Sequence, residues 1–216
     1  LPLIPIIVDP SDTGKVVTGL KTVLDPPAYV VEQDSTQISN QIVNPIINHM
    51  RTMSEELLAH EDTFEPEIEE WPGTVMALNQ TLDITCTELD VTAYPEDATI
   101  YIDGERYLKY LAQKEALTIK KYPNQVVVFN FDTATNVDLD TFRVQYKNPD
   151  NTWQEPISTQ SNWKDTSDDG INRKIDTIAQ HIVFNCANAT TVQTGGVAGM
   201  ILVPKKHSTL TIQYES

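Results

Sequence analysis

The sequence predicts a mainly β fold with one long helix, and two observations lead to this fold class. From Trp71 onward, apolar residues gather in runs of about five, separated by turn residues, as is typical of short strands. Only residues 37–60 show the three- and four-residue spacing of a helix face. One helix among many strands excludes a doubly wound α/β fold, in which helices and strands alternate. A β-sandwich with a helical insertion and a β-solenoid with one helix alongside both fit this order.

The first part of the chain is predicted to be extended. Residues 1–13 form an N-terminal extended segment that ends in turn-forming residues, and residues 14–216 form a single domain. Residues 1–8, LPLIPIIV, are apolar and are a candidate arm that adds a strand to another copy of the chain. Packing of this arm on its own domain is the alternative. We therefore expect self-association, with residues 1–8 as its candidate route.

Residues 37–60 are predicted to form the one long helix. Its apolar stripe consists of Ile38, Ile42, Ile46, Met50, Met53 and Leu57. Asn44 and Pro45 fit either the start of the helix or a kink within it. We expect the stripe to cover an apolar face of the β domain, so its role is core packing rather than ligand binding.

The strands expected after the helix are short and are interrupted by turns. They are predicted in the segments TVMAL, LDITC, LDVTAY, TIYIDGERY, LTIKKY, QVVVFNF, FRVQYK, HIVFN, TTVQT, GMILVP and LTIQY. Asp103-Gly104 is a hairpin turn signal, and residues 148–153, NPDNTW, predict another turn. Residues 60–71 are acidic and are expected to form a solvated linker that closes the helix.

Charge and hydropathy exclude two classes of partner. The chain has 31 Asp and Glu against 15 Lys and Arg, a formal net charge of −16, which repels nucleic-acid phosphates. No apolar run approaches the ~20 residues that span a bilayer, so no membrane insertion is expected. The chain begins with Leu1 rather than Met, which indicates a processed N-terminus from which a signal peptide has been removed. The predicted location is therefore extracellular or at the cell surface.

Two cysteines and two sequons are candidates for covalent modification. Cys86 and Cys186 lie in β-like runs, which fits either a disulfide in an oxidising compartment or two buried free thiols. Asn79 and Asn188 begin Asn-x-Thr triplets and are candidate glycosylation sites in a eukaryotic source. Such triplets often arise by chance.

Residues 165–176, DTSDDGINRKID, align with a calcium-binding loop. The candidate metal ligands are Asp165, Ser167, Asp169 and Asp176. Oxygen ligands at alternate positions, with Gly170 at the sharp turn, suit a calcium ion. Asn172 stands where an apolar residue is usual and no helices flank the loop, so a plain acidic surface turn is favoured. Residues 131–140 resemble such a loop less closely, and no other cofactor is expected.

The sequence lacks the motifs of several enzyme classes. HEDTF, at residues 60–64, has no second histidine of a zinc-protease motif, because its last position is Phe64. His49 and His60 share a helix face but lie ~16 Å apart along the axis, which is too far for one metal ion. There is no Gly-x-Ser-x-Gly elbow and no phosphate-binding glycine loop, so no enzymatic activity is expected. A carboxylate pair of the glycosidase type stays open, because its separation is invisible in the sequence.

The stretch near the C-terminus, IVFNCANATTVQTGGVAGMILVPKKHSTL, has a recognisable order of strands and corners. A strand ends in Phe184-Asn185, corners follow at residues 188–190 and at Gly195-Gly196, and residues 199–204 form a Gly-x-Ile-Leu-x-Pro strand. This pattern resembles the closing segment of the choice-of-anchor A domains, which are adhesive domains of secreted and surface proteins. Two further segments, residues 124–131 and 47–60, are similar to the family's inner strand and helix.

The resemblance implies a β-solenoid of triangular cross-section with one long α-helix packed alongside, similar to the fold of ice-binding proteins. Asn188 then belongs to a strand corner, which favours a structural role over glycosylation. We therefore expect a non-enzymatic extracellular or cell-surface protein of structural or adhesive type. It would self-assemble into filaments or a surface matrix and bind protein or polysaccharide surfaces.

Two alternative functions stay open. The first is an ice-binding protein with a flat threonine face, although the sequence has no regular Thr-x-Thr ladder. The second is a polysaccharide-active enzyme on a β-helix, which requires a cleft with two convergent carboxylates.

Overall fold

The structure is a computed structural model of the chain, and it describes most of the residues. The described residues are 6–8, 30–32, 39–63, 65–77, 80–148, 150–159, 181–195 and 199–213. The chain divides into two compact units, Leu1–Met50 and Arg51–Ser216, which are described separately. The boundary predicted after residue 13 stays a prediction.

The first unit contains a small parallel sheet and the start of the long helix. β1 (Ile6–Val8) pairs in parallel with β2 (Val30–Glu32), so part of the apolar N-terminal segment forms a strand with its own chain. The π-helical turn η1 (Ser39–Val43) leads directly into α3 (Asn44–Leu58), within the range predicted as helix. Because η1 precedes α3 without a break, Pro45 lies inside a continuous helical run, where its missing backbone N–H removes a helical hydrogen bond.

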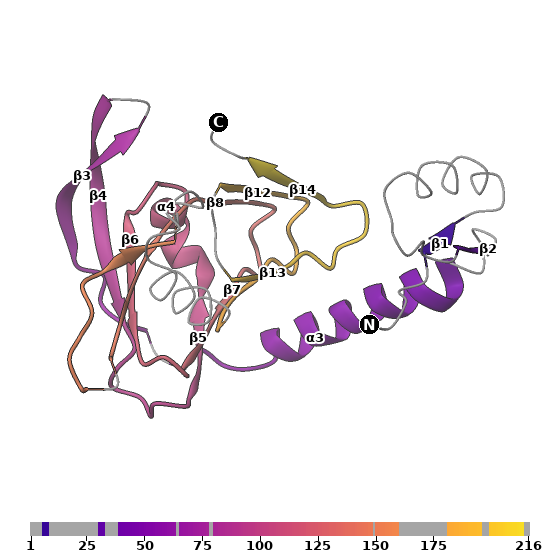
Figure 1. Cartoon of the computed structure of the whole chain (residues 1–216), viewed down its shortest axis with the longest axis horizontal. Coiled ribbons are helices and arrows are strands. Elements are labelled where there is room, and N and C mark those ends of the chain that lie inside the picture. The colour runs from indigo at the N-terminus through magenta and orange to yellow at the C-terminus, as the bar shows by residue number, and fades with distance from the viewer. Residues whose placement is uncertain are drawn as a thin grey trace. The chain divides into compact units, whose positions relative to one another are not determined.

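The second unit is mainly β, as predicted, and has three sheets that are parallel or mixed (Figure 1). The strand orders are β10-β9-β6-β4-β3, β13-β11-β7-β5 and β14-β12-β8, which are called the first, second and third sheets below. The strands are β3 (Glu70–Ala77), β4 (Gln80–Asp90), β5 (Thr99–Asp103), β6 (Leu117–Lys121), β7 (Val126–Asn130), β8 (Asn136–Leu139), β9 (Arg143–Tyr146), β10 (Ile157–Ser158), β11 (Ile182–Asn185), β12 (Thr191–Gly195), β13 (Met200–Leu202) and β14 (Thr209–Gln213).

The chain passes through the three sheets in a repeating order. After β4 and β5, the strands β6, β7 and β8 each join one sheet in turn, and β9, β11 and β12 then join the same sheets in the same order. β13 and β14 extend the second and third sheets. The pairs β3–β4 and β9–β10 are antiparallel, whereas the neighbours on successive passages are parallel.

In-register columns of apolar side chains build one core that the three sheets share. Ile102, Phe129 and Phe184 are register partners on β5, β7 and β11, and none is more than 1% exposed. The rings of Phe129 and Phe184 stack with centroids 5.4 Å apart. Burial of each such side chain contributes about 1.5–3 kcal/mol to stability, which explains why consecutive passages keep the same register.

The hairpin predicted at Asp103-Gly104 is wrong. β5 pairs in parallel with β7, and Asp103 instead caps a 3-10 helix, η2 (Gly104–Tyr107), by accepting a hydrogen bond from the Glu105 N–H. A second short helix, α4 (Leu108–Leu111), follows, whereas the sequence predicted only one helix. Gly104 is required for space, because a Cβ there would lie 2.7 Å from the Phe131 ring.

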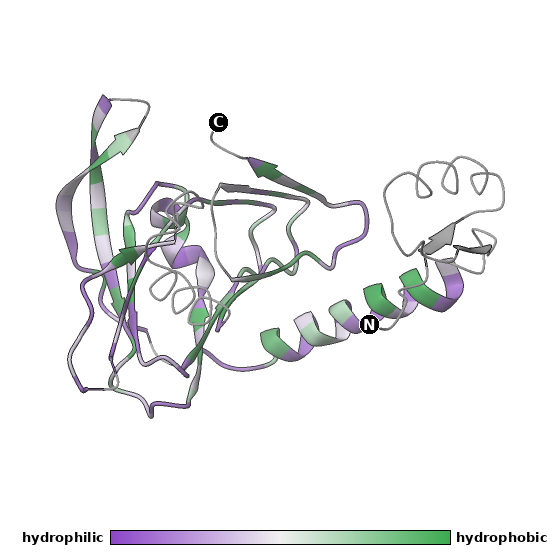
Figure 2. Cartoon of the chain, viewed as in Figure 1, coloured by the Kyte–Doolittle hydropathy of each residue, from purple (hydrophilic) through white to green (hydrophobic). Residues whose placement is uncertain are grey.

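The last two turns of α3 belong to the second unit and bind the face of the second sheet that points away from the core. Hydrophobic residues recur along α3 (Figure 2), but its fully buried residue is Ser54, only 2% exposed. Of the predicted stripe, Met53 and Leu57 lie in this unit and are half-buried, and Ile38 lies outside the described residues. The centre of this contact is polar, because the strands beneath the helix present buried asparagines that require polar partners.

Candidate functional site

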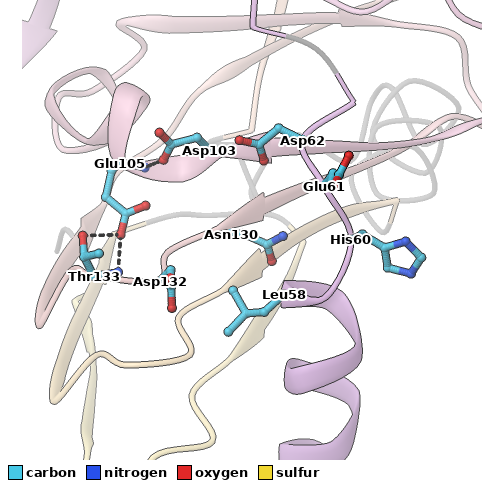
Figure 3. Close-up of a pocket in the computed structure, with 9 residues that line it drawn as sticks. All are labelled: Leu58, His60, Glu61, Asp62, Asp103, Glu105, Asn130, Asp132 and Thr133. Atoms are coloured by element: carbon cyan, nitrogen blue, oxygen red, sulfur yellow. Dashed lines mark hydrogen bonds between the residues drawn. The ribbon is translucent and has the colours of Figure 1, made fainter.

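An acidic pocket of about 400 Å³ opens in the second unit where three segments meet. Its lining residues are Leu58, His60, Glu61, Asp62, Asp103, Glu105, Asn130, Asp132 and Thr133 (Figure 3). They come from the end of α3 and the residues after it, from the end of β5, and from the end of β7. The segments are distant in sequence, and the parallel pairing of the second sheet brings two of them together.

Register and backbone hydrogen bonds place the three segments. Asp103 on β5 is the register partner of Asn130 on β7, so the residues that follow both strands lie at the same sheet edge. The segment after α3 runs along β5, where the Thr63 N–H donates to the Tyr101 carbonyl over 2.8 Å. In return, the Tyr101 N–H donates to the Thr63 hydroxyl over 2.8 Å. The pocket walls are thus held by main-chain contacts.

Glu105 fastens the turn after β7. Its Oε1 accepts hydrogen bonds from the Thr133 N–H at 2.7 Å and the Thr133 hydroxyl at 3.1 Å (Figure 3). The Ala134 N–H donates to the same oxygen over 2.9 Å. Burial alone would raise the pKa of Glu105, but the hydrogen bonds from Thr133 and Ala134 outweigh it and lower the pKa. Glu105 is therefore ionised, and its hydrogen bonds to Thr133 and Ala134 give it a structural role.

Asp103 and Asp62 have the opposite tendency. Burial raises the pKa of Asp103, and the neighbouring Glu105 carboxyl group raises it further. Burial also raises the pKa of Asp62, with a smaller contribution from the negative charge of Glu65. Asp103 and Glu105 thus form a pair of neighbouring carboxyl groups whose pKa values are shifted in opposite directions.

The other polar groups of the pocket point to structural roles. The His60 ring is stacked on Tyr101, with centroids 4.3 Å apart, and points away from the carboxylates (Figure 3). Asp132 accepts from the Asn188 side-chain amide through its carbonyl at 2.6 Å. Within the described ranges, no group of three or more His, Cys, Asp or Glu residues is arranged to hold a metal ion. The carboxylates therefore lie near one another without converging on a common point.

The two candidate calcium loops lie in different parts of the chain. The residues of the first, Asp165, Ser167, Asp169 and Asp176, lie outside the described residues. The second, less similar candidate at residues 131–140 is wrong as a calcium loop, because residues 136–139 form β8. Asp138 is exposed on that strand, whereas Asp132 lies in the pocket.

The covalent modification sites have different outcomes. The disulfide considered for Cys86 and Cys186 is not formed, and both cysteines are buried free thiols. Cys86 lies on β4 of the first sheet, whereas Cys186 directly follows β11 of the second sheet, where burial raises its pKa to about 12. Asn188 is exposed and its amide is bonded to Asp132, while Asn79 lies outside the described residues.

A second surface of interest is the outer side of the third sheet, called the polar face below. Its residues are Asn136, Asp138, Thr191, Gln193, Thr209 and Thr211. They form two in-register rows across β8, β12 and β14, and all except the half-buried Thr191 are exposed. Because strands in a sheet lie ~4.8 Å apart, the face carries polar groups at regular intervals.

The sequence pointed to fragments of the pocket without joining them. HEDTF partly resembles a metal motif, Asp103-Gly104 predicts a hairpin, and residues 131–140 resemble a calcium loop, and all three segments contribute residues to the same pocket. The usable signal was an acidic residue directly after each of two apolar runs, TIYI and VVVFNF. Their proximity depends on the parallel register of β5 with β7.

Comparison with known proteins leaves the function to be inferred from geometry. No protein-family model matches the chain, and no curated protein or solved structure matches it. In the part of the chain that the structure describes, no helix has the length and apolar character needed to cross a membrane.

Proposed function

We propose that this protein is a non-enzymatic structural or adhesive protein of the cell exterior, built as a β-solenoid that works by surface contact and self-association. The observation that carries the proposal is the regular, exposed polar face of the third sheet, supported from beneath by a continuous core. The repeating order in which the chain passes through the three sheets supports a solenoid, because each passage corresponds to one coil.

The polar face suits binding to an extended, repetitive surface. The row Asp138, Gln193 and Thr211 combines a carboxylate, an amide and a hydroxyl at equal spacing, so it offers both donors and acceptors. Polysaccharides and protein sheets present hydrogen-bonding groups at regular intervals and are the ligand classes that such a face fits. Asp138 and Gln193 interrupt the threonines, which favours these ligands over ice.

The carboxylates of the pocket are engaged in structural hydrogen bonds, which favours a non-enzymatic role over catalysis. Glu105 is occupied by Thr133 and Ala134 donors, and Asp103 caps η2, so both carboxylates have roles in holding the backbone. A glycosidase needs two carboxyl groups about 5–9.5 Å apart with free oxygen atoms facing the substrate. The hydrogen bonds to Glu105 Oε1 also lower the pKa of this carboxyl group, which makes it a weaker base.

A polysaccharide-active enzyme is the second candidate, and one observation favours it. The pKa values of Asp103 and Glu105 are shifted in opposite directions, as in acid–base pairs of hydrolases. Asp103→Asn would then abolish release of reducing sugar while leaving polysaccharide binding intact.

Binding to insoluble polysaccharides and protein-coated beads tests both candidates. The panel contains cellulose, chitin, peptidoglycan and collagen-coated beads, and the readouts are the bound fraction and released reducing sugar. The test variant is Asp138→Arg with Gln193→Arg, which are register partners on the polar face. The matched control is Asp83→Arg with Thr74→Arg, exposed register partners on the first sheet with the same change in charge.

We expect binding to at least one surface, a tenfold or greater loss with the polar-face variant, and no loss with the control. No sugar should be released. Binding that responds equally to both variants, or sugar release that Asp103→Asn abolishes, would overturn the proposal.

A further inference from the structure

The last strand of the third sheet leaves core positions uncovered. Val137, Val192 and Leu210 form one register column on β8, β12 and β14, with exposed fractions of 2%, 0% and 44%. Ile212, two residues further along β14, is 55% exposed. Figure 2 shows hydrophobic residues on this outermost strand. Leu210 and Ile212 therefore occupy inward positions that no further strand covers among the described residues.

On the side of β14 opposite to β12, no described strand pairs with its backbone. The Thr209 N–H donates to the Thr190 carbonyl, so this residue bonds toward β12. Backbone groups alternate in direction along a strand, so Thr211 also faces β12, whereas Leu210 and Ile212 direct their N–H and C=O groups to the open edge. Edge strands are usually protected by charged residues or proline, and β14 (Thr209–Gln213) contains neither.

The opposite ends of the sheets are covered within the chain. On the third sheet, α4 lies beside β8, and the Asp140 N–H donates to the Leu111 carbonyl over 2.6 Å. β3 covers β4 on the first sheet, and the residue Thr63 bonds to the edge of β5 on the second. In a head-to-tail stack, β14 of one copy would have to displace these covering segments from the next copy. Pairing of β14 with β14 of a second copy displaces none of them.

The sequence of β14 is complementary to itself. In an antiparallel pair centred on Thr211, Leu210 of one copy lies opposite Ile212 of the other, and Thr209 lies opposite Gln213. Directly opposite residues project from the same face, so apolar side chains meet apolar side chains. Leu210 and Ile212 also carry the backbone groups that face the edge, so they form the hydrogen-bonded pairs and Thr211 forms the non-hydrogen-bonded pair.

Charge around the edge acts in two ways. Lys205 and Lys206 are exposed in the turn before β14 and attract acidic groups at short range. Two copies that each carry a net charge of −16 repel one another at longer range. The pairing of β14 therefore depends on its self-complementary sequence, and salt that screens the repulsion should strengthen it.

We infer that β14 pairs antiparallel with β14 of a second copy, forming a closed two-fold dimer through Leu210 and Ile212. This inference rests on the proposed self-association and names its surface and its symmetry. A five-residue ladder is a small interface, so the dimer is reversible and depends on concentration. In a two-fold dimer, the β14 edge of each copy is covered by the other copy. No β14 edge is then left for a third copy, so this contact forms a dimer and not a filament.

A cysteine placed on the axis tests the register directly. Thr211→Cys in the full chain brings two thiols together at a non-hydrogen-bonded position, where Cα atoms lie ~4.5 Å apart and a disulfide can form. The native thiols of Cys86 and Cys186 are buried and do not interfere. We expect a covalent dimer on mild oxidation, read on non-reducing gels.

The matched controls are Thr209→Cys and Gln213→Cys. Each alone faces a different residue across the axis and should not cross-link, whereas a mixture of the two variants should. Cross-linking of either variant alone, or no cross-linking of Thr211→Cys, would overturn the proposed register.

Sedimentation velocity over a concentration series measures the association itself. Ile212→Pro removes an N–H that faces the open edge, so it keeps the ladder with β12 and should weaken dimerisation at least tenfold. Leu82→Pro, at an exposed apolar position on β4, should leave dimerisation unchanged if circular dichroism shows both variants folded. If either proline variant is unfolded, Ile212→Lys and Leu82→Lys replace the pair.

The outcomes separate this inference from the proposed function. Association that persists in Ile212→Pro, or that disappears when residues 1–8 are removed, would assign the contact elsewhere and overturn this inference alone. A chain that is monomeric at all concentrations overturns both this inference and the proposed self-association. Binding to polysaccharides and protein-coated beads is a separate measurement, and it tests the adhesive role independently of dimerisation.

Discussion

Ser54 and Asn185 join α3 to the second sheet through a reciprocal pair of hydrogen bonds. The Ser54 hydroxyl donates to Asn185 Oδ1 over 2.6 Å, and the Asn185 amide donates to the Ser54 carbonyl over 3.0 Å. The same amide donates to Asn130 Oδ1 over 2.9 Å, and Asn130 in turn donates to the Leu57 carbonyl. Two register partners on β7 and β11 thus hold two turns of one helix.

Replacing the central amide should loosen this helix. Asn185→Ala leaves the buried Ser54 hydroxyl and the Asn130 amide with fewer partners, so we expect a loss of ~2–4 kcal/mol in the free energy of unfolding. Denaturant unfolding measures it. Asn136→Ala, at an exposed position on β8, is the control and should change stability by less than ~0.5 kcal/mol. Equal effects for the two variants would show that the α3 contact contributes nothing.

The Tyr107 hydroxyl is buried and has no hydrogen-bond partner among the described residues. Tyr107→Phe removes this unsatisfied group and keeps the ring contact with Phe129, whose centroid lies 5.9 Å away. We expect stability to be unchanged or raised by up to ~1 kcal/mol in thermal unfolding. Tyr110→Phe is the contrast, because the Tyr110 hydroxyl donates to Glu70, and it should lower stability.

Spectrophotometric titration gives an independent check on Tyr107. Burial raises the pKa of its phenol to about 12, so one tyrosine should ionise well above pH 10 in the native protein. Burial also raises the pKa values of Tyr101, Tyr110 and Tyr146, so the late step in Tyr107→Phe should be smaller by one tyrosine. A native titration that is identical in the two proteins would contradict the assignment.

Lys121 makes stability depend on pH in the alkaline range. Its ammonium is fully buried and donates to the Tyr122 and Pro123 carbonyls, and burial lowers its pKa to about 7 from 10.5. Between these values the unfolded chain binds a proton that the folded chain does not, so this residue makes stability rise with pH. Below about pH 7 both states are protonated, and the lysine adds no slope.

Lys121→Met should remove that slope. Relative to the variant, the native protein should gain up to ~1.4 kcal/mol of unfolding free energy per pH unit between pH 7 and pH 10. Urea unfolding at several pH values measures both proteins. A constant difference across this range would show that Lys121 is protonated in the folded state throughout.

Glu105→Gln tests the pocket as a structural clamp. Hydrogen bonds from Thr133 and Ala134 lower the pKa of Glu105 below its ordinary value of 4.5, so the ionised side chain stabilises the fold above that pH. We expect a loss of ~1 kcal/mol at pH 7, after allowance for solvent screening, and a smaller loss as the pH falls below 4.5. Glu61→Gln in the same pocket should have little effect on unfolding at either pH.

Several local features were predictable because they depend on neighbouring residues in the chain. The runs around VVVFN and IVFN form β7 and β11, and the three- and four-residue spacing predicted the helix that forms α3. The hairpin at Asp103-Gly104 failed for a specific reason. The same dipeptide suits a tight turn and a helix cap, and the parallel partner β7 decides between them.

The candidate site was beyond prediction, since its parts are joined only in space. His60, Asp103 and Asp132 lie in three separate segments of the sequence, and the local pattern of each segment predicts a different role. The sequence does not predict that Ser54 is buried, because a serine in a helix is usually exposed to solvent. Its buried partner Asn185 lies in the second sheet, 131 residues away.

The amino-acid sequence alone determined the mainly β class, the position of the long helix and the acidic surface. These follow from backbone periodicity and charge, which are properties of short segments or of the whole composition. The tertiary structure decided which strands are register partners, which asparagines bind α3, and that no described strand covers the outer edge of β14. Register and burial arise from contacts between distant segments, and the free energy of those contacts exists only once the sheets have formed.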